Sequence, residues 1–219
     1  MASEKVIDVR SIQHLVIAGW TGRNASAVEA HIKELEAIGV SRPKTVPIFY
    51  RVASALLTGD DWIEVVAEAS SGEVEFVLYS LPDGLWIGVG SDHTDRKAEA
   101  ISVTLSKQIC GKPVGTRVWR YADVAPNWDR LTLRSFVHVD GERRLYQEGP
   151  VTTMRSPEEL IRLYTDDNSL AAGTAMFCGT LAVRGGVASA DVFEMELEDP
   201  VLGRTLNHSY RIITLPNEG

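Results

Sequence analysis

Apolar and polar residues follow two different periods along the chain, and each period predicts a different element. Short apolar runs bounded by glycine or turn residues occur at 14–20 (HLVIAGW) and 85–90 (LWIGVG), and both are typical of strands. Segment 26–40 instead has apolar residues at helical spacing and predicts a helix that stops at Gly39. The apolar positions of this helix are Val28, Ile32, Leu35 and Ile38.

Two hairpins are predicted in the middle of the chain. Residues 62–69 and 73–79 have the pattern of strands, and the turn SSG between them predicts that they pair. The turn LPDG predicts a second hairpin, between 73–79 and 85–90. Most of the chain beyond residue 111 also has the pattern of strands and glycine turns.

Two further helices complete the prediction. A helical pattern covers 94–109, with Thr94 or Asp95 as its N-cap. SPEELIRLY predicts a short helix, because Ser156 and Glu159 stand in capping-box register. A strand-rich chain with about three helices indicates an α+β or mixed α/β fold with a large β component.

Composition narrows the classes of function. The net charge is −8, with no basic patch for nucleic acid or for an anionic membrane, so we expect neither as a partner. No apolar run approaches the roughly 20 residues of a membrane-spanning helix, and the N-terminus MASEKVIDVR lacks the apolar region of a signal peptide. Two cysteines, Cys110 and Cys178, are too few for a disulfide framework, which favours the cytoplasm. Without repeats or long linkers, residues 1–219 are expected to form a single domain.

Three acidic residues stand where the hairpin of 73–79 and 85–90 is expected to open. Glu73 and Glu75 project from one face of their strand, and the pairing brings Asp92 back beside them. Their repulsion is relieved if the face is exposed, if one acid is protonated, or if a cation lies between them. Three converging carboxylates are also the ligand set that hard divalent cations prefer. Helix N-capping is the alternative role for Asp92.

Two histidines are candidates for chemistry. His31 and Glu34 share one face of the helix 26–40, where the carboxylate would orient the imidazole as a base for water. An exposed pair on the charged side of that helix explains the same spacing. His93 follows Asp92 and is a candidate ligand, although a histidine in a polar turn is more often hydrogen-bonded or exposed.

The order of these features resembles fumarylacetoacetate hydrolase and its small bacterial relatives, the acylpyruvases and related C–C bond hydrolases and decarboxylases. The segments that carry the resemblance, within about residues 14–210, are GWTGRN followed by HIKEL, PKTVPIFYRVASALL, EVE, SDHTDR, GKPVGT and GTAMFCGTLAVRGG. More narrowly, the chain resembles a bacterial family of unknown function that shares this fold. The resemblance implies a fumarylacetoacetase-like curled β-sheet or β-roll, α+β and strand-rich, with a few flanking helices, in a homodimer.

The resemblance also implies a metal and a substrate class. Glu73 and Glu75 of EVE and Asp92 of SDHTDR would hold Mg²⁺ or Mn²⁺. The substrate would be a small 2-oxo or dicarbonyl acid of the acylpyruvate type. The metal would stabilise the enolate that forms when a C–C bond breaks.

Five more residues receive roles from the resemblance. His31, oriented by Glu34, would activate water. Lys112 of GKPVGT and Arg96 of SDHTDR would neutralise the substrate carboxylate or the developing oxyanion, and Thr180 of GTAMFCGT would donate a hydrogen bond there. Without the resemblance, Lys112 is expected to face solvent and Arg96 to pair with a neighbouring acid, Asp95 or Glu99.

Departures from the family pattern keep other reactions open. The stretch between Glu75 and Asp92 is shorter than in the family, and about three extra residues precede His31. Ser91 occupies the position where the family has asparagine, and Thr174 the position where it usually has aspartate. A metal-dependent decarboxylase or tautomerase and a non-catalytic ligand-binding relative therefore remain alternatives.

A thiol hydrolase is a further alternative. Cys178 lies in MFCGT, where His31 or His93 would activate it. Buried cysteine more commonly behaves as a small apolar residue.

Overall fold

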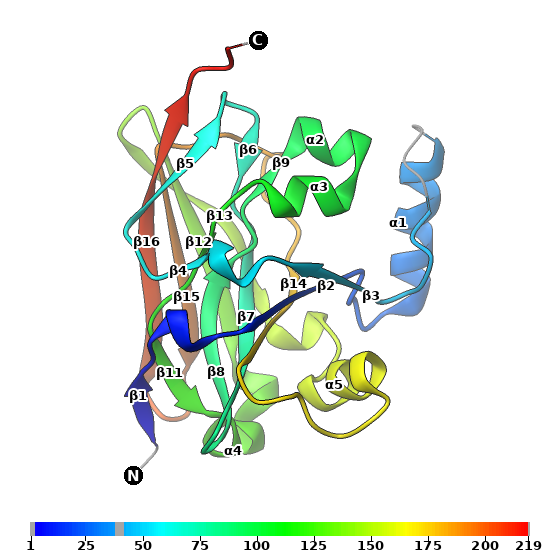
Figure 1. Ribbon diagram of the computed structural model, residues 1–219, viewed down its shortest axis with the longest axis vertical. Helices are drawn as coiled ribbons and strands as arrows, with labels where there is room; N and C mark the ends of the chain where they lie inside the picture. The colour runs from blue at the N-terminus through cyan, green and yellow to red at the C-terminus, as the bar shows by residue number, and fades with distance from the viewer. Residues whose placement is uncertain (1–2, 38–41, 219) are drawn as a thin grey trace.

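The body of the molecule consists of two β-sheets that face each other (Figure 1). The computed structural model describes residues 3–37 and 42–218. The seven-stranded sheet has the order β1 (Glu4–Val6), β11 (Arg117–Arg120), β8 (Gly84–Ser91), β7 (Val74–Leu81), β14 (Thr174–Thr180), β2 (His14–Gly19), β3 (Ile48–Val52). The five-stranded sheet has the order β13 (Glu142–Pro150), β12 (Thr132–Val139), β15 (Val192–Asp199), β16 (Arg204–Leu215), β5 (Trp62–Val66).

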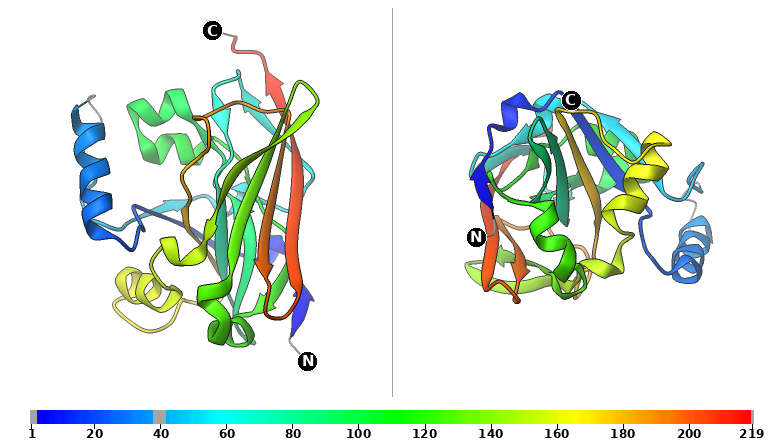
Figure 2. Two further views of the ribbon diagram at one scale, coloured as in Figure 1. Left: turned by 180° about the vertical axis from the view of Figure 1, so that it is seen from behind. Right: turned by 90° about the horizontal axis from the view of Figure 1, so that it is seen from below.

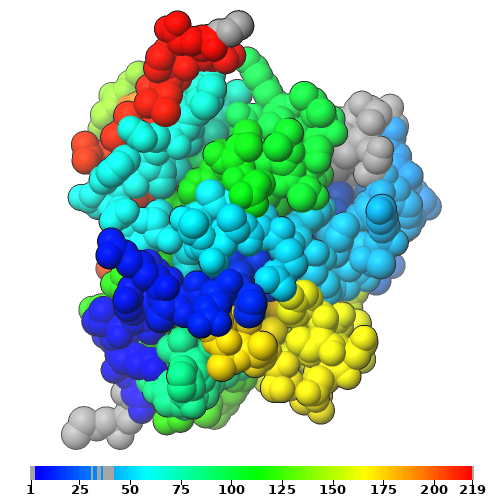
Figure 3. Space-filling model, in the orientation of Figure 1, coloured from blue at the N-terminus to red at the C-terminus, as the bar shows by residue number. Residues whose placement is uncertain are grey.

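Two short strand pairs and several helices surround these sheets. The pairs are β4 (Leu57–Thr58) with β10 (Lys112–Pro113), and β6 (Ser70–Ser71) with β9 (Thr94–Asp95). The α-helices in the described residues are α1 (Ala25–Ala37), α2 (Arg96–Ile101), α3 (Val103–Gln108), α4 (Tyr121–Val124) and α5 (Pro157–Thr165). Figure 2 shows α1 and α5 on the side of the molecule away from β16, and Figure 3 shows α2 and α3 on the outer surface. This strand-rich α+β architecture confirms the predicted fold class.

Alternation along β7 divides the core into two layers. Val74, Phe76 and Leu78 point into the cluster between the two sheets, where they meet residues of the smaller sheet such as Phe193. Val77 and Tyr79 point to the opposite face, into a second cluster with β2 and β3. Glu75 has the parity of Val77 and Tyr79, so β7 directs this carboxylate to the second face, beyond the end of the apolar layer.

The predicted hairpin between 73–79 and 85–90 is confirmed. β7 and β8 pair antiparallel from Leu81↔Gly84 at the turn to Val74↔Ser91 at the open end. The other predicted hairpin is wrong, because β5 pairs in parallel with β16 and β7 lies between β8 and β14. The turn SSG predicted that the strand at 62–69 pairs with the next strand in sequence. In the structure, β5 pairs with β16, which lies almost 150 residues later in the chain.

The predicted helix over 94–109 is two helices. The backbone is extended at Ser102, with φ −159° and ψ 116°, and the Ser102 hydroxyl accepts a hydrogen bond from Leu105 N. A serine can offer the backbone this alternative to a continuous helix. Asp95 caps α2 by accepting from Ala98 N, as one of the two predicted caps. The break turns α3 back over the end of the sheet (Figure 1).

The two other predicted helices are present. α1 begins after Asn24, whose side chain accepts a hydrogen bond from Ala27 N, and its predicted stop at Gly39 lies outside the described residues. α5 begins after Ser156, which accepts from Glu159 N as the capping box predicts. Among the described residues, no helix has both the length and the apolar character needed to cross a membrane.

Candidate metal centre

Three carboxylates meet at the open end of the β7–β8 hairpin. The side chains of Glu73, Glu75 and Asp92, called the acid cluster below, each place one oxygen within 4.8 Å of the others. Strand pairing brings them together, because Asp92 N donates to Glu73 O at 3.0 Å where the two strands separate. Exposure does not relieve their repulsion, since Glu75 is 2% exposed and Asp92 is fully buried.

Glu75 is held by a distortion of the neighbouring strand. The register between β7 and β14 shifts between Phe177 and Thr180, and this aims Gly179 N at Glu75 Oε2, 2.6 Å away. Gly179 has φ +102°, and a Cβ there would lie 1.8 Å from Thr21 Oγ1, so only glycine fits. Burial, reinforced by the charges of Asp92 and Glu73, raises the pKa of Glu75 well above its usual value.

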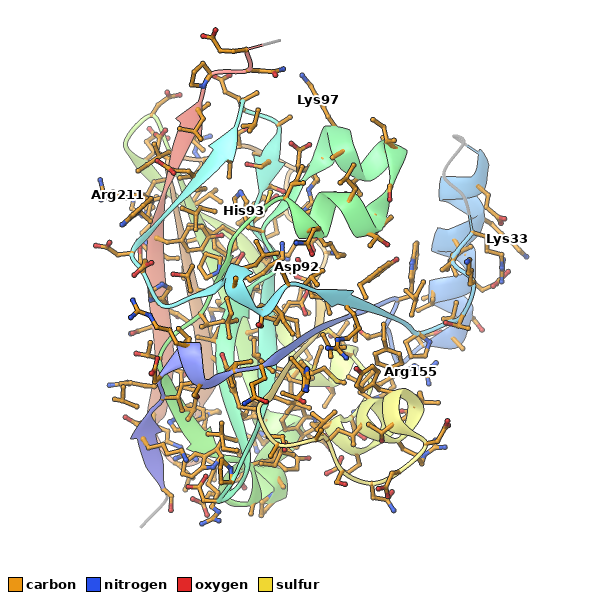
Figure 4. All side chains as sticks on the ribbon, viewed as in Figure 1. Lys33, Asp92, His93, Lys97, Arg155 and Arg211 are labelled. Carbon is orange, nitrogen blue, oxygen red and sulfur yellow. The ribbon has the colours of Figure 1, made fainter. Side chains whose placement is uncertain are left out.

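Asp92 is surrounded by cations. Its Oδ2 accepts a short hydrogen bond from Lys107 Nζ, and its Oδ1 lies 3.2 Å from Lys112 Nζ. Burial alone would raise the pKa of Asp92, but the two ammonium groups outweigh burial and lower that pKa. Asp92 therefore stays ionised inside the protein. Figure 4 shows Asp92 and His93 in the interior, between the strands and the helices α2 and α3.

Lys112 does not face solvent, contrary to the expectation without the family resemblance. The side chain is fully buried, and Nζ donates to the carbonyl oxygen of His93 at 2.6 Å. Burial lowers the pKa of Lys112, and the attraction of Asp92 opposes this effect. β10 fixes the lysine at this depth by pairing with β4 at Lys112↔Leu57.

Arg96 closes the outer side of the acid cluster. Its Nε donates to Ser71 Oγ at 2.8 Å, and its two terminal nitrogens donate to Glu73 and Glu99 at 2.9 Å each. The pairing with Glu99 is one of the two acid partners expected from sequence. These contacts use three of the five N–H donors of the guanidinium, one on each nitrogen.

Thr180 lies opposite Glu75 in the strand pairing. Its hydroxyl donates to Val74 O at 2.8 Å and accepts from Gln147 Nε2 at 2.8 Å. The hydroxyl proton of Thr180, which was expected to bind a substrate oxygen, therefore points to the backbone of β7. Substrate binding by Thr180 requires the hydroxyl to exchange that partner.

His93 is part of a buried hydrogen-bond chain and not of the acid cluster. Its Nδ1 lies 3.0 Å from Tyr210 Oη and its Nε2 lies 2.9 Å from Ser70 Oγ. Tyr210 in turn donates to Ser91 Oγ at 2.8 Å. Burial, together with the positive charge of Lys112, lowers the pKa of His93 to about 3. Both ring nitrogens have protein partners, so His93 has none to offer a metal.

The His31–Glu34 pair lies on α1, but both side chains fall outside the described residues. Described charges on the same helix form exposed pairs, with Arg42 donating to Glu29 at 2.6 and 3.0 Å. The role of His31 and Glu34 stays a prediction.

Cys178 does not have the surroundings of a reactive thiol. The side chain is fully buried, and Sγ donates to Met176 O at 3.3 Å. Burial and the charge of Glu75 raise the pKa of the thiol, which favours the unreactive protonated form. The alternative of a thiol hydrolase at Cys178 loses its support.

Lys107 is the charged residue that sequence reasoning missed. A lysine in the last turn of a helix is expected to interact with the helix dipole at the surface, yet Lys107 is only 6% exposed and reaches into the acid cluster. The available signal was the spacing of the two lysines in LSKQICGK, five residues apart with an apolar pair between them.

The acid cluster fits a hard divalent cation. Asp92 Oδ1 is fully buried and accepts no hydrogen bond from the described residues, although Lys112 lies near it. Glu75 forms no ion pair within the described residues, and burial next to Asp92 and Glu73 raises its pKa. Oxygen donors from three carboxylates suit Mg²⁺, Mn²⁺ or Ca²⁺.

Solved structures with this fold include enzymes. The chain is similar to Cg1458 (16% identity, TM-score 0.66, covering 93% of this chain and 77% of that one). It is similar to 2-keto-3-deoxy-D-arabinonate dehydratase complexed with magnesium and 2,5-dioxopentanoate (17%, 0.67, 94% and 75%). It is also similar to yeast Ynq8, a fumarylacetoacetate hydrolase family protein (16%, 0.66, 96% and 96%). At these identities the likeness shows the fold, which is that of fumarylacetoacetate hydrolase.

Sequence comparison gives the family. A search of curated proteins finds no match. A family model matches residues 18–210, which is most of the chain, and its description is "Protein of unknown function (DUF2848)". The chain therefore belongs to the DUF2848 family, and it has the fumarylacetoacetate hydrolase-like fold.

Proposed function

We propose that this protein is a divalent-metal-dependent enzyme that hydrolyses a C–C bond in a small 2-oxo or dicarbonyl acid of the acylpyruvate type. The observation that carries the proposal is the acid cluster, with three carboxylate oxygens within 4.8 Å of one another and one buried oxygen of Asp92 that accepts no hydrogen bond from the described part of the chain. The similar dehydratase, complexed with magnesium and a dioxo acid, supports the same class of metal and substrate.

Glu73, Glu75 and Asp92 would hold Mg²⁺ or Mn²⁺. When bound, the ion would supply Lewis-acid stabilisation to the enolate that forms as the C–C bond breaks. Lys112 keeps a positive charge beside this position, fixed by its hydrogen bond to His93 O. That charge would offset the negative charge that develops on the substrate.

His31 is the proposed base for water, oriented by Glu34 three residues later on α1. We expect His31→Ala to reduce hydrolysis by roughly 10²-fold or more, the typical range for a general base, while Mn²⁺ affinity stays unchanged. Steady-state kinetics and calorimetric metal titration of the same preparation measure the two quantities. Equal loss of both would assign His31 a structural role instead.

A reaction that forms the same enolate without water, decarboxylation or tautomerisation, is the second candidate. The insertion of about three residues before His31 favours it, because the insertion changes the position of the base relative to the GRN turn. Product analysis separates the candidates, since hydrolysis releases two carboxylic or keto acids, decarboxylation releases CO₂, and tautomerisation conserves mass.

Metal removal tests the proposal directly. Purified protein is stripped with EDTA, assayed against a panel of acylpyruvates and other 2-oxo acids, and reloaded with Mg²⁺ or Mn²⁺. We expect activity to disappear on stripping and to return on reloading. Unchanged turnover after chelation would contradict the proposal.

We also propose that the protein is a homodimer. Light scattering during size-exclusion chromatography measures its molar mass in solution.

A further inference from the structure

Lys107 is a buried cation that the proposed chemistry does not use. It lies on α3, and its ammonium hydrogen-bonds to Asp92 Oδ2 and lies 3.8 Å from Glu73 Oε2. The ammonium therefore contacts two of the three carboxylates of the acid cluster.

Both oxygens of Asp92 face an ammonium group. Oδ2 is occupied by Lys107, and Oδ1 lies 3.2 Å from Lys112. Since Asp92 is fully buried, neither oxygen is turned toward water. Divalent ions of this class bind oxygen at about 2.0–2.6 Å. Asp92 Oδ1 accepts no hydrogen bond from the described residues, whereas Lys107 Nζ contacts both Asp92 Oδ2 and Glu73 Oε2. An ion that joins Asp92 to Glu73 through these two oxygens therefore has to displace Lys107.

The contacts identify Lys107 as the lysine that yields. Lys112 has a second anchor, the carbonyl oxygen of His93 at 2.6 Å. Among the described residues, the only hydrogen bond of Lys107 Nζ is the one to Asp92. Lysine also carries its charge on a flexible four-carbon chain. Lys107 can leave Asp92 without breaking another hydrogen bond, whereas Lys112 cannot.

Charge balance gives the reason for such a residue. The three acids of the cluster face three cations, Arg96, Lys107 and Lys112. Without Lys107, the three carboxylates, which lie within 4.8 Å of one another, would keep only Arg96 and Lys112 as neighbouring positive charges. A divalent ion would supply the same compensation more strongly.

We propose that Lys107 is a built-in counter-ion of the acid cluster, which holds Glu73 and Asp92 together in the metal-free protein and competes with a divalent ion for Asp92. This inference rests on the proposed function, because it concerns the same three carboxylates. Metal affinity in this protein is then set by the competition and not by the acids alone.

The test is calorimetric titration of EDTA-stripped full-length protein with Mn²⁺ alone. Lys107→Met removes the competing charge, and we expect it to bind Mn²⁺ at least about tenfold more tightly than the wild type. The metal-free variant should also melt at a lower temperature, and saturating Mn²⁺ should raise that temperature more than in the wild type. Lys107→Arg keeps a charge and should not tighten binding.

Lys97→Met is the matched control, because Lys97 is exposed on the adjacent helix α2 and points outward (Figure 4). Its Mn²⁺ affinity should equal that of the wild type. Lys107→Gln is the second neutral variant, and failure of both neutral variants to fold in Mn²⁺ would overturn the inference, because the ion should restore the charge balance.

The remaining outcomes separate this inference from the proposed function. If the wild type binds Mn²⁺ and both neutral variants bind it equally or more weakly, Lys107 does not compete with the ion. That result overturns this inference and leaves the proposed metal site intact. Binding by the neutral variants but not by the wild type supports the role of Lys107 and contradicts a metal-dependent wild-type enzyme. Absence of binding in all proteins overturns both.

Discussion

The two ends of the β7–β8 hairpin both pair an aspartate with lysine, in opposite surroundings. At the turn, Asp83 accepts hydrogen bonds from Lys5 Nζ at 2.7 Å and Trp86 Nε1 at 3.0 Å, and the side chains of Lys5 and Asp83 are 31% and 53% exposed. At the open end, Asp92 is fully buried between Lys107 and Lys112.

The difference indicates which end serves function. An exposed ion pair contributes about 0–1 kcal/mol, and Asp83 fits a turn of the ordinary Pro-Asp-Gly kind. A buried pair pays a desolvation cost of several kcal/mol per ion, and apolar residues often replace such pairs with no loss of stability. Stability alone therefore does not account for the open end, whereas the proposed binding of a cation would.

Replacing the aspartate should give the largest difference in stability loss between the two ends of the hairpin. Asp92→Asn leaves two buried ammonium groups without their shared carboxylate, so we expect the free energy of unfolding to fall by about 3–5 kcal/mol. Asp83→Asn at the exposed end should cost less than about 1 kcal/mol. Urea denaturation measures both values. Similar losses for the two variants would contradict the comparison.

Glycine substitutions should give the next largest difference. Gly179→Ala combines an unfavourable φ of +102° with a Cβ placed 1.8 Å from Thr21 Oγ1, and we expect a loss of about 3 kcal/mol. Gly84 in the hairpin turn also has positive φ, +124°, but its Cβ would meet only the flexible end of Arg120 at 3.4 Å. Gly84→Ala should therefore cost only about 1 kcal/mol in the same denaturation experiment. A smaller loss for Gly179→Ala than for Gly84→Ala would show that the strand shift does not depend on glycine.

Low pH should destabilise the folded protein through His93 at the open end of the hairpin. Its pKa in the folded protein is about 3, below the unfolded value near 6.5, so between these values the unfolded state binds a proton that the folded state does not. The stability from neutral His93 is therefore complete above about pH 6.5 and is lost as the pH falls. We expect a loss of about 1–2 kcal/mol from pH 6.5 to 5. His93→Gln should flatten this part of the stability profile, and an equal slope in the variant would exclude His93 as its source.

Sequence reasoning reached the acid cluster because a hairpin is a local structure. LPDG fixes the turn, strand alternation fixes the parity of Glu73 and Glu75, and the pairing then returns Asp92 to the same end. The strand-rich fold followed from the same kind of pattern, strengthened by the order of the family segments.

The features that were missed depend on distant contacts. The partner of β5 is β16, which no turn between adjacent segments can indicate. Lys107 followed a helical pattern that runs on through Ser102, so its reversal toward the acid cluster was not visible from periodicity. Arg96 donates to Glu73, and Thr180 hydrogen-bonds to Val74 O and Gln147. These contacts also depend on tertiary packing.

The most direct test of the metal centre is a crystal structure of the wild type grown with Mn²⁺, recorded at a wavelength where manganese scatters anomalously. We predict one anomalous peak within about 2.0–2.6 Å of an oxygen from each of Glu73, Glu75 and Asp92, with the Lys107 ammonium moved away from Asp92. A structure at saturating Mn²⁺ with no peak there, and with Lys107 still bonded to Asp92, would contradict the account.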